Sequence, residues 1–244
     1  MSTLRRLHEI GGSADGPCGW PGATGRAGLV ALALAGLVGL GPSWADRHGQ
    51  ATAIGRVERA DGGHCTGGLV ASRTVLTAAH CAFKDGARIA ATDLRFAAGR
   101  IYDQADAVVA VAAVELPDSY SYAPNPDRAE ALVADVALLR LEGPVGAAPM
   151  RLAPRPPDAS FDSIGYAAGD PRAPTKQHAC TIAERDLPDA LWATTCFAIP
   201  GVSGAPLITT ERAPRILGII VAFNRRAAIA VPAATILRHF PELR

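Results

Sequence analysis

Hydrophobic residues along most of the chain occur in short runs rich in Val, Ile, Leu and Thr, separated by Gly, Pro, Asp and Asn. Such runs favour extended chain, and the residues between them favour turns. The pattern predicts strands at Ala53–Arg59, Gly67–Ala71, Thr74–Thr77, Ala107–Glu115, Val136–Leu141, Ile164–Tyr166, Pro206–Ile208, Ile216–Phe223 and Ala227–Val231. It predicts one terminal helix, at Pro232–Phe240, with proline in the first turn. Short strands without alternating helices indicate an all-β sandwich or barrel.

A proline-rich stretch, Glu142–Asp158, divides these strands into two groups. Its five prolines restrict the backbone, so we expect an ordered connection between two β units rather than a flexible linker.

The N-terminal region has a different pattern. Ala27–Leu40 carries no charge, follows Arg26 and breaks at Gly41, and small residues stand at Ser43 and Ala45. The apolar run is shorter than the roughly 20 residues that cross a bilayer. We therefore expect residues 1–45 to hold a secretory signal cleaved after Ala45, leaving a secreted (extracellular or periplasmic) chain, 46–244, with no stable membrane insertion. A buried helix or an uncleaved anchor is the alternative.

Composition excludes several function classes. The chain has 24 Lys and Arg against 23 Asp and Glu, so it lacks the basic excess that nucleic-acid binding requires. Its hydrophobic content of 49% excludes a disordered chain. We find no phosphate-binding loop, dinucleotide fingerprint or metal cluster in the sequence, and expect a monomer without a cofactor or metal.

The cysteines support export. Removal of residues 1–45 takes Cys18 away and leaves an even number, Cys65, Cys81, Cys180 and Cys196, which suggests disulfides in an exported chain. Four cysteines allow three pairings, and proximity in sequence favours Cys65–Cys81 and Cys180–Cys196. Each bridge is worth about 3 kcal/mol by loop-closure entropy. Zinc is the alternative, but neither pair has the close Cys-x-x-Cys spacing that metal sites favour.

Three segments carry residues capable of nucleophilic chemistry: Leu76–Cys81 (LTAAHC), Asp135–Leu141 (DVALLRL) and Gly201–Leu207 (GVSGAPL). A serine hydroxyl becomes a nucleophile when an imidazole takes its proton, and a buried carboxylate orients that imidazole. Glycine at 201 lets the backbone direct its N–H toward a developing oxyanion, beside the N–H of Ser203.

Taken in this order, the three segments resemble the trypsin-like (chymotrypsin-fold) serine peptidases, and the bacterial secreted members most closely. The resemblance extends to Ala53–Val57 and Cys65–Val70 and covers roughly residues 52–241. It implies that His80 is the general base, Asp135 the orienting acid and Ser203 the nucleophile, acting on a protein or peptide substrate.

The resemblance also implies a fold. It is all-β, with two antiparallel six-stranded β-barrels, a cleft between them and a short C-terminal helix. The first barrel would span about 50–141, the second about 159–231, and the helix 232–241.

Departures from the family concern activation and specificity. Val202 stands where many animal members carry the Asp that binds the new N-terminal amine after zymogen cleavage, so activation by that ion pair is not expected. Phe197 falls near the base of the specificity pocket, where trypsins carry Asp, and Val221 falls where Glu-specific members carry His. The edge strand expected to pair with substrate backbone is Val221, Ala222, Phe223 and Asn224.

This sequence favours a pocket for small or apolar side chains. The alternative is that Phe197 packs into the barrel and a loop shapes the pocket.

Two other functions compete. An α/β-hydrolase would need Gly-x-Ser-x-Gly and the order Ser, acid, His. Here Ala205 stands two positions after Ser203, and the order is His, Asp, Ser. The sequence therefore does not fit an α/β-hydrolase. A catalytically silent binding protein of the trypsin-like fold stays open, although all three triad residue types and Gly201 are retained.

Overall fold

The computed structural model describes residues 53–122, 129–154, 160–183, 187–224 and 227–244. The predicted signal segment, 1–45, lies outside the described residues. The strands of the first group are β1 (Ile54–Arg59), β2 (His64–Ala71), β3 (Thr74–Thr77), β6 (Leu94–Ala98), β7 (Ala107–Glu115) and β8 (Ala137–Leu141). Those of the second group are β9 (Phe161–Gly165), β10 (Thr175–Cys180), β11 (Ile182–Ala183), β12 (Trp192–Thr194), β13 (Pro206–Ile208), β14 (Ile216–Asn224) and β15 (Ala227–Pro232).

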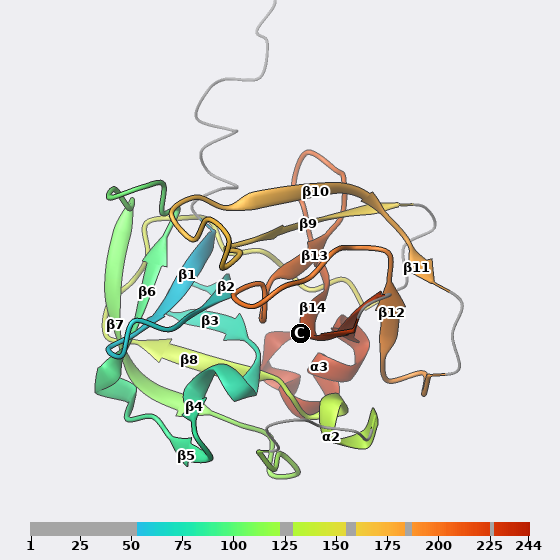
Figure 1. Cartoon of the computed structure of the whole chain (residues 1–244), viewed down its shortest axis with the longest axis horizontal. Helices are drawn as coiled ribbons and strands as arrows, with labels where there is room; N and C mark the ends of the chain where they lie inside the picture. The colour runs from blue at the N-terminus through green and yellow to red at the C-terminus, as the bar shows by residue number, and fades with distance from the viewer. Residues whose placement is uncertain (1–52, 123–128, 155–159, 184–186, 225–226) are drawn as a thin grey trace, which may run out of the picture. The chain divides into compact units, whose positions relative to one another are not determined.

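The first group closes into an antiparallel barrel with the strand order β1-β2-β3-β8-β7-β6 (Figure 1). Large apolar side chains fill its interior, and Leu69, Leu76, Phe96 and Leu139 are fully buried. The pairing of β3 with β8 sets Thr77 opposite Ala137. Because the two strands are antiparallel, the residues just after β3 and just before β8 come to the same end of the barrel.

The second group forms one curled sheet with the order β10-β9-β13-β14-β15-β12-β11. Its two edge strands, β10 and β11, are consecutive in the chain and only Thr181 separates them. The edges of the sheet therefore meet. If β10 and β11 are counted as one bent strand, the sheet has the six strands expected of the second barrel, and the expected two-barrel fold is confirmed.

The connection between the two units is hydrogen-bonded to both. Val145 N donates to Ser72 O at 2.9 Å and Met150 N donates to Leu69 O at 2.8 Å, both in the first unit. Ala153 N donates to Ile216 O of the second sheet at 2.7 Å. Backbone groups of residues 145–153 thus join the sheets, while 155–159 lie outside the described residues.

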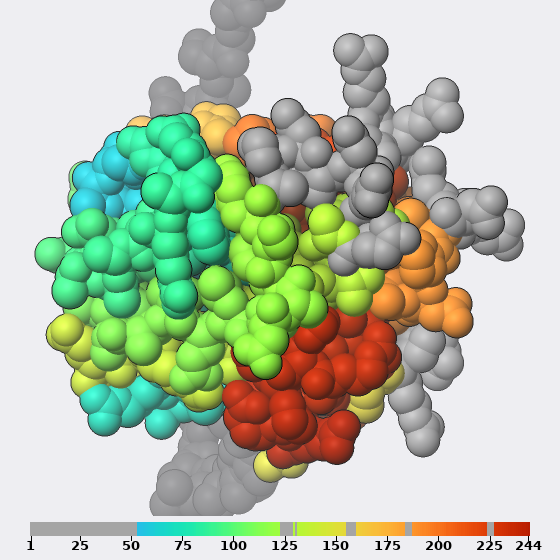
Figure 2. Space-filling view, turned by 90° about the horizontal axis from the view of Figure 1, so that it is seen from below, coloured from blue at the N-terminus to red at the C-terminus, as the bar shows by residue number. Residues whose placement is uncertain are grey.

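Helices are short. They are α2 (Ala129–Val133), α3 (Ala233–His239) and the 3-10 helices η1 (Ala79–Ala82), η2 (Ala91–Asp93) and η3 (Pro241–Leu243), and a small hairpin pairs β4 (Phe83–Lys84) with β5 (Ala87–Arg88). Figure 2 shows the red C-terminal residues lying against yellow-green residues from the first unit. There His239 Nε2 is 3.2 Å from Val133 O and Arg140 pairs with Glu242 at 3.2 Å. Within the described ranges, no helix has the length and apolarity to span a membrane.

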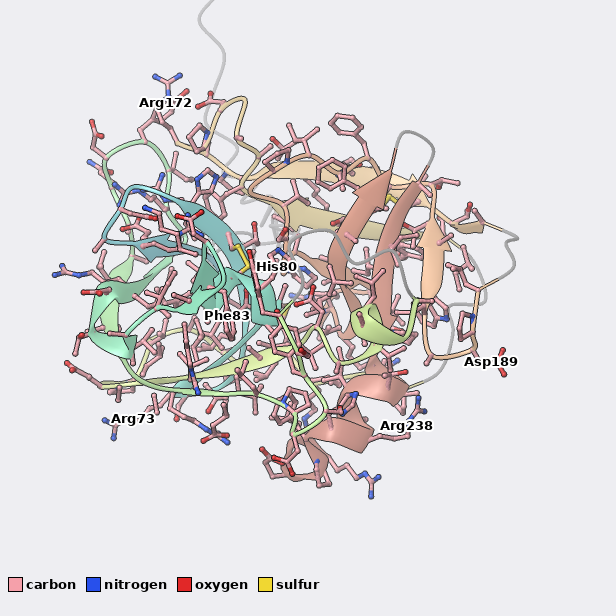
Figure 3. The ribbon with its side chains drawn as sticks, turned by 60° about the horizontal axis from the view of Figure 1, so that its bottom comes forward. Arg73, His80, Phe83, Arg172, Asp189 and Arg238 are labelled. Atoms are coloured by element: carbon pink, nitrogen blue, oxygen red, sulfur yellow. A yellow bond between two sulfur atoms is a disulfide. The ribbon has the colours of Figure 1, made fainter. Side chains whose placement is uncertain are left out.

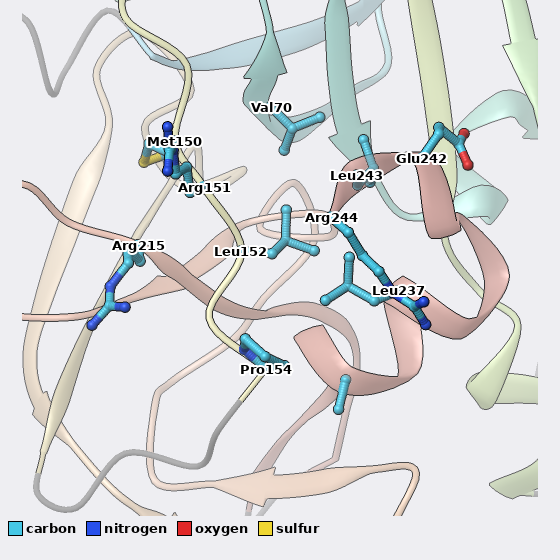
Figure 4. A pocket seen from close by; sticks show the side chains of 11 residues that line it. Val70, Met150, Arg151, Leu152, Pro154, Arg215, Leu237, Glu242, Leu243 and Arg244 are labelled. Atoms are coloured by element: carbon cyan, nitrogen blue, oxygen red, sulfur yellow. The ribbon is translucent and has the colours of Figure 1, made fainter.

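A pocket of about 880 Å³ lies beside the connection and α3 (Figure 4). Val70, Leu152 and Leu237 contribute its apolar lining, and arginines such as Arg151 and Arg215 also line it. None of the predicted site residues lines this pocket.

Candidate active site

His80 and Asp135 meet at the end of the first barrel where β3 stops and β8 starts. His80 lies in η1, three residues after β3, and Asp135 lies two residues before β8. Nδ1 of His80 is 2.7 Å from Oδ2 of Asp135, and the backbone N–H of His80 donates to Oδ1 at 2.9 Å. The carboxylate is buried, whereas the imidazole is about one-third exposed. Asp135 therefore fixes the ring and leaves its other edge accessible.

The predicted disulfides are both present, Cys65–Cys81 and Cys180–Cys196. The first anchors the residue next to His80 to strand β2, and Figure 3 shows the yellow sulfur bond beside His80. The ligand atoms of Cys65, His80 and Cys81 lie within 4.8 Å of one another. Because the two sulfurs are bonded to each other, neither can act as a thiolate ligand of zinc.

Ser203 lies in a tight turn that requires glycine on both sides. Gly201 and Gly204 have φ of +91° and +81°, a region that favours glycine. A Cβ on Gly201 would collide with Tyr166 O and approach His64 Nε2 to 2.5 Å, and one on Gly204 would collide with Thr66 O. The glycines of the GVSG segment are thus required by backbone conformation and by close packing.

Two backbone N–H groups of this turn point at no acceptor within the described part of the chain: those of Gly201 and Ser203. The intervening N–H, that of Val202, donates to Ile199 O at 3.1 Å. Pro200 O accepts a hydrogen bond from Ala168 N at 2.8 Å. Since the C=O and N–H of a trans peptide point in opposite directions, this contact directs the N–H of Gly201 away from Ala168. Free, directed donors of this kind suit an oxyanion.

The turn packs against the strand that leads to His80. Ser203 O accepts a hydrogen bond from Thr66 N at 2.8 Å, and a Cβ on Gly204 would lie 3.0 Å from Ala78 N. The three predicted triad residues thus lie on segments that adjoin one another. Among the described residues, the Ser203 hydroxyl is in no hydrogen bond, so the contact between Ser203 and His80 is not formed here.

Residues that the sequence reasoning did not assign to the site also lie here. His64 is half-buried, and its Nε2 donates to Tyr166 O at 3.1 Å. Burial is the main cause that lowers the pKa of His64. Burial also raises the pKa of Tyr166 to about 12, and its hydroxyl donates to Arg100 O. No sequence motif predicted that His64 lies beside Gly201 and Tyr166, because this position depends on packing between β2 and the second sheet.

Aromatic side chains lie near Asp135. The ring of Phe83 stacks on Tyr122, with centroids 5.0 Å apart, and contacts Tyr120 at 5.6 Å. Burial first, and then the negative charge of Asp135, raise the pKa of Tyr120. Tyr120 and Tyr122 lie in a loop and Phe83 in the short strand β4, so no local motif in the sequence predicted this cluster.

The predicted pocket residues divide into exposed and buried ones. Phe197 is 65% exposed and Phe223 is 45% exposed, so the alternative in which Phe197 packs into the barrel is wrong. Gln177 holds Phe197 by two hydrogen bonds to its backbone, each 2.6 Å. Val221 is buried in the core, and Ala222 is partly buried. The side chain of Asn224 lies outside the described residues.

Comparison with known proteins identifies the family. A scan against protein-family models matches the trypsin-like peptidase domain over residues 65–219. This span exceeds half of the chain and includes His80, Asp135 and Ser203. The chain belongs to the trypsin-like peptidase domain family. This trypsin-like peptidase is a serine endopeptidase, a hydrolase that acts on proteins or peptides.

Solved structures have the same fold. A Glu endopeptidase in complex with MPD is 17% identical, with a TM-score of 0.62 over 79% of this chain and 89% of that one. The Rv3671c protease in its inactive form is 18% identical, with a TM-score of 0.56 over 80% and 90%. At these identities the likeness concerns the fold alone. A search of curated proteins found no match to the trypsin-like peptidase described here.

Proposed function

We propose that this trypsin-like peptidase is a secreted serine endopeptidase that uses Ser203, His80 and Asp135 as its triad and favours small or apolar residues before the cleaved bond. The observation that carries the proposal is the 2.7 Å contact between His80 Nδ1 and the buried Asp135 carboxylate. This contact keeps the proton on Nδ1, so Nε2 is free to accept the proton of a serine.

In the proposed reaction, Ser203 Oγ attacks the substrate carbonyl carbon while His80 Nε2 takes its proton. The resulting imidazolium is stabilised by Asp135. His80 then gives the proton to the leaving amine, which departs and leaves an acyl-enzyme on Ser203. Water, activated by the same imidazole, releases the acid and restores the hydroxyl.

The negative charge that develops on the carbonyl oxygen needs donors that are already in place. The N–H groups of Gly201 and Ser203, which donate to no acceptor in the described ranges, are suited to that role. Removal of one such donor in related chemistry slows turnover by about 10²–10³.

The proposal for specificity rests on apolar side chains at the positions where a charged side chain would select substrates of the opposite charge. Phe197 and Phe223 are exposed apolar residues, and a buried substrate cation without a partner carboxylate costs several kcal/mol. Val221 is buried and offers no donor to an acidic side chain. Asp189 precedes strand β12 and lies at the right-hand edge of the view in Figure 3.

Secretion is proposed from two observations. Residues 1–45 have the pattern of a secretory signal, and the chain has two disulfides, which are typical of oxidising compartments and rare in the cytosol. We also propose that the mature chain acts as a monomer, without a cofactor or metal.

A catalytically silent binding protein is the second candidate, favoured by the absence of a Ser203–His80 hydrogen bond among the described residues. In structures without substrate, catalytic hydrogen bonds are often long or poorly aligned, and they tighten when substrate binds.

One experiment separates the two candidates. The purified 46–244 form is incubated with a peptide library, beside Ser203→Ala and His80→Ala. The proposal expects cleavage after small or apolar residues and a loss of several orders of magnitude in both variants. A binding protein would cleave nothing in any form.

A further inference from the structure

Thr66 is a fully buried residue of β2 whose polar groups are all hydrogen-bonded. Its N–H donates to Ser203 O at 2.8 Å, and its hydroxyl donates to Gly201 O at 2.9 Å. The same hydroxyl accepts from Tyr166 N at 2.9 Å, and its carbonyl accepts from the hydroxyl of Thr77 at 2.7 Å. One side chain of the first barrel thus joins two segments of the second sheet.

We propose that Thr66 is a positioning residue of the oxyanion hole, and that its hydroxyl holds the Gly201 peptide in the orientation that directs the Gly201 N–H at substrate. The proposal rests on the proposed function, because it assumes that Gly201 and Ser203 supply the two donors. Thr66 itself touches no reacting atom.

The geometry around Gly201 explains why a hydroxyl is needed. The peptide before Gly201 is held by the hydrogen bond from Ala168 N to Pro200 O. The peptide after it is held by the hydrogen bond from Thr66 to Gly201 O and by that from Val202 N to Ile199 O. Glycine at φ +91° has no Cβ to restrict its rotation, so these contacts fix the direction of its N–H.

No apolar side chain can replace this hydroxyl. It acts as a donor toward Gly201 O and as an acceptor toward Tyr166 N at the same time. Without it, both buried backbone groups lose their partner, and the peptide after Gly201 keeps only the hydrogen bond from Val202 N to Ile199 O. Serine can make both contacts, whereas valine has the shape of threonine and can make neither.

Thr66 also links the oxyanion hole to the general base. Thr77, which donates to Thr66 O, is the last residue of β3, three positions before His80. The segment that supplies the oxyanion donors and the segment that supplies the base therefore share one buried anchor.

The test compares Thr66→Val with Thr66→Ser in the 46–244 form. Thr235→Val is the matched control, because Thr235 is also a buried threonine whose hydroxyl donates to a backbone carbonyl, that of Ala190, but it lies in α3. Two quantities are measured: kcat and KM on fluorescein-labelled casein, and the rate of inactivation by diisopropyl fluorophosphate. In that inactivation His80 takes the Ser203 hydroxyl proton, the Ser203 oxygen bonds to phosphorus, and the P–F bond breaks with loss of fluoride. The phosphoryl oxygen then occupies the oxyanion hole.

We expect Thr66→Val to lower kcat and the inactivation rate by about 10- to 100-fold, with KM changed by less than about 3-fold. Thr66→Ser should restore both rates to within about 3-fold of the parent, and Thr235→Val should keep them. The proposal is overturned if Thr66→Val has the same kcat and inactivation rate as the parent. It is also overturned if Thr66→Ser loses as much of both rates as Thr66→Val.

A crystal structure of the diisopropyl fluorophosphate adduct of the parent tests the same point without a variant, should Thr66→Val fail to fold. The Thr66 hydroxyl should stay between Gly201 O and Tyr166 N, with the phosphoryl oxygen on the N–H groups of Gly201 and Ser203. A Thr66 hydroxyl turned away from Gly201 O overturns the inference. Casein cleavage that survives in Ser203→Ala overturns the proposed function instead, so the two failures are distinguishable.

Discussion

The two carboxylate oxygens of Asp135 bind the same residue: one accepts the backbone N–H of His80 at 2.9 Å and the other contacts its Nδ1 at 2.7 Å. A carboxylate held in this way sets both the position of the ring and the location of its proton. The negative charge of Asp135 is stable in its buried position because the carboxylate accepts two hydrogen bonds. Its partner, the His80 ring, also becomes cationic during the reaction.

Asp135→Asn should abolish most of the activity without unfolding the protein. The amide oxygen can keep the bond to the His80 backbone, and the amide nitrogen then donates to Nδ1. This forces the proton of the imidazole onto Nε2, which can no longer accept one from Ser203. We expect kcat to fall by about 10⁴. The measurement is casein hydrolysis together with thermal unfolding, and a variant within tenfold of the parent would contradict the assigned role of Asp135.

Loss of the Cys65–Cys81 bridge should affect turnover more than loss of Cys180–Cys196. The first bridge fixes the residue next to His80, whereas the second fixes the residue next to Phe197. Replacement of both cysteines of either bridge by alanine should lower the free energy of unfolding by about 3 kcal/mol. Denaturation and steady-state kinetics of both double variants check this.

We expect the double variant at 65 and 81 to lose kcat, and the one at 180 and 196 to change KM or the preferred residue. Mass mapping of the non-reduced parent should first find both bridges. Free thiols at these positions would contradict both the disulfides and the export of the protein.

Acid should destabilise the folded protein through His64. Burial lowers its pKa below 6.5, and the nearby charges of Arg56 and Arg59 add to this, while the Tyr166 carbonyl and Glu58 oppose it. As the pH falls below 6.5, the unfolded chain binds a proton at His64 before the folded protein does. The free energy of unfolding therefore decreases from pH 6.5 down to the folded-state pKa.

His64→Gln should reduce the decrease in the free energy of unfolding over this pH range. The glutamine amide can still donate to Tyr166 O, but it does not titrate. The control is His178→Gln, which removes a histidine whose side chain is 66% exposed. Urea denaturation at several pH values gives the profile. An unchanged slope in His64→Gln would show that another group causes the acid sensitivity.

The sequence predicted the parts of this molecule in which local pattern and packing agree. The ranges of β3, β7 and β13 match those predicted, as does most of α3. Every residue of β3 and β13 is buried, as the pattern indicates, whereas β7 is mostly exposed or partly exposed and is held by its pairing with β6 and β8. The missed strand β10 has a polar, largely exposed sequence, TKQHAC, and is held by pairing with β9 rather than by burial. The missed strand β12 is only three residues long.

At the site, the sequence placed His80 and Asp135 correctly beside each other because both belong to motifs next to paired strands. Thr66 and His64 could not be found in this way. Their roles come from contacts with Gly201 and Tyr166, more than 100 positions away in the chain, and no local pattern records such contacts.

Activation should not require a free N-terminus. Val202 is buried among apolar residues and has no charge to bind an amine. A form with a short N-terminal tag should therefore cleave as fast as one that starts at Asp46. If only the untagged form is active, the N-terminus binds a group other than residue 202.

Specificity should change when a carboxylate is placed at the expected pocket base. The parent should cleave after Ala or Leu faster than after Arg or Lys, and Phe197→Asp should improve Arg substrates by tenfold or more, which corresponds to about 1.4 kcal/mol. Phe223→Asp is the comparison at the second exposed phenylalanine. A parent that already prefers Arg by tenfold would contradict the apolar pocket and require a carboxylate from a loop, such as Asp186 or Asp189.

The most direct measurement of the proposed mechanism is the site of covalent attachment of diisopropyl fluorophosphate. The 46–244 form is treated with the reagent, digested and mapped by mass spectrometry, beside His80→Ala and Ser203→Ala. We predict one adduct per chain, on Ser203, formed far more slowly in His80→Ala and absent in Ser203→Ala. An adduct on another residue, or the same rate without His80, would contradict the assignment of Ser203 as a nucleophile activated by His80.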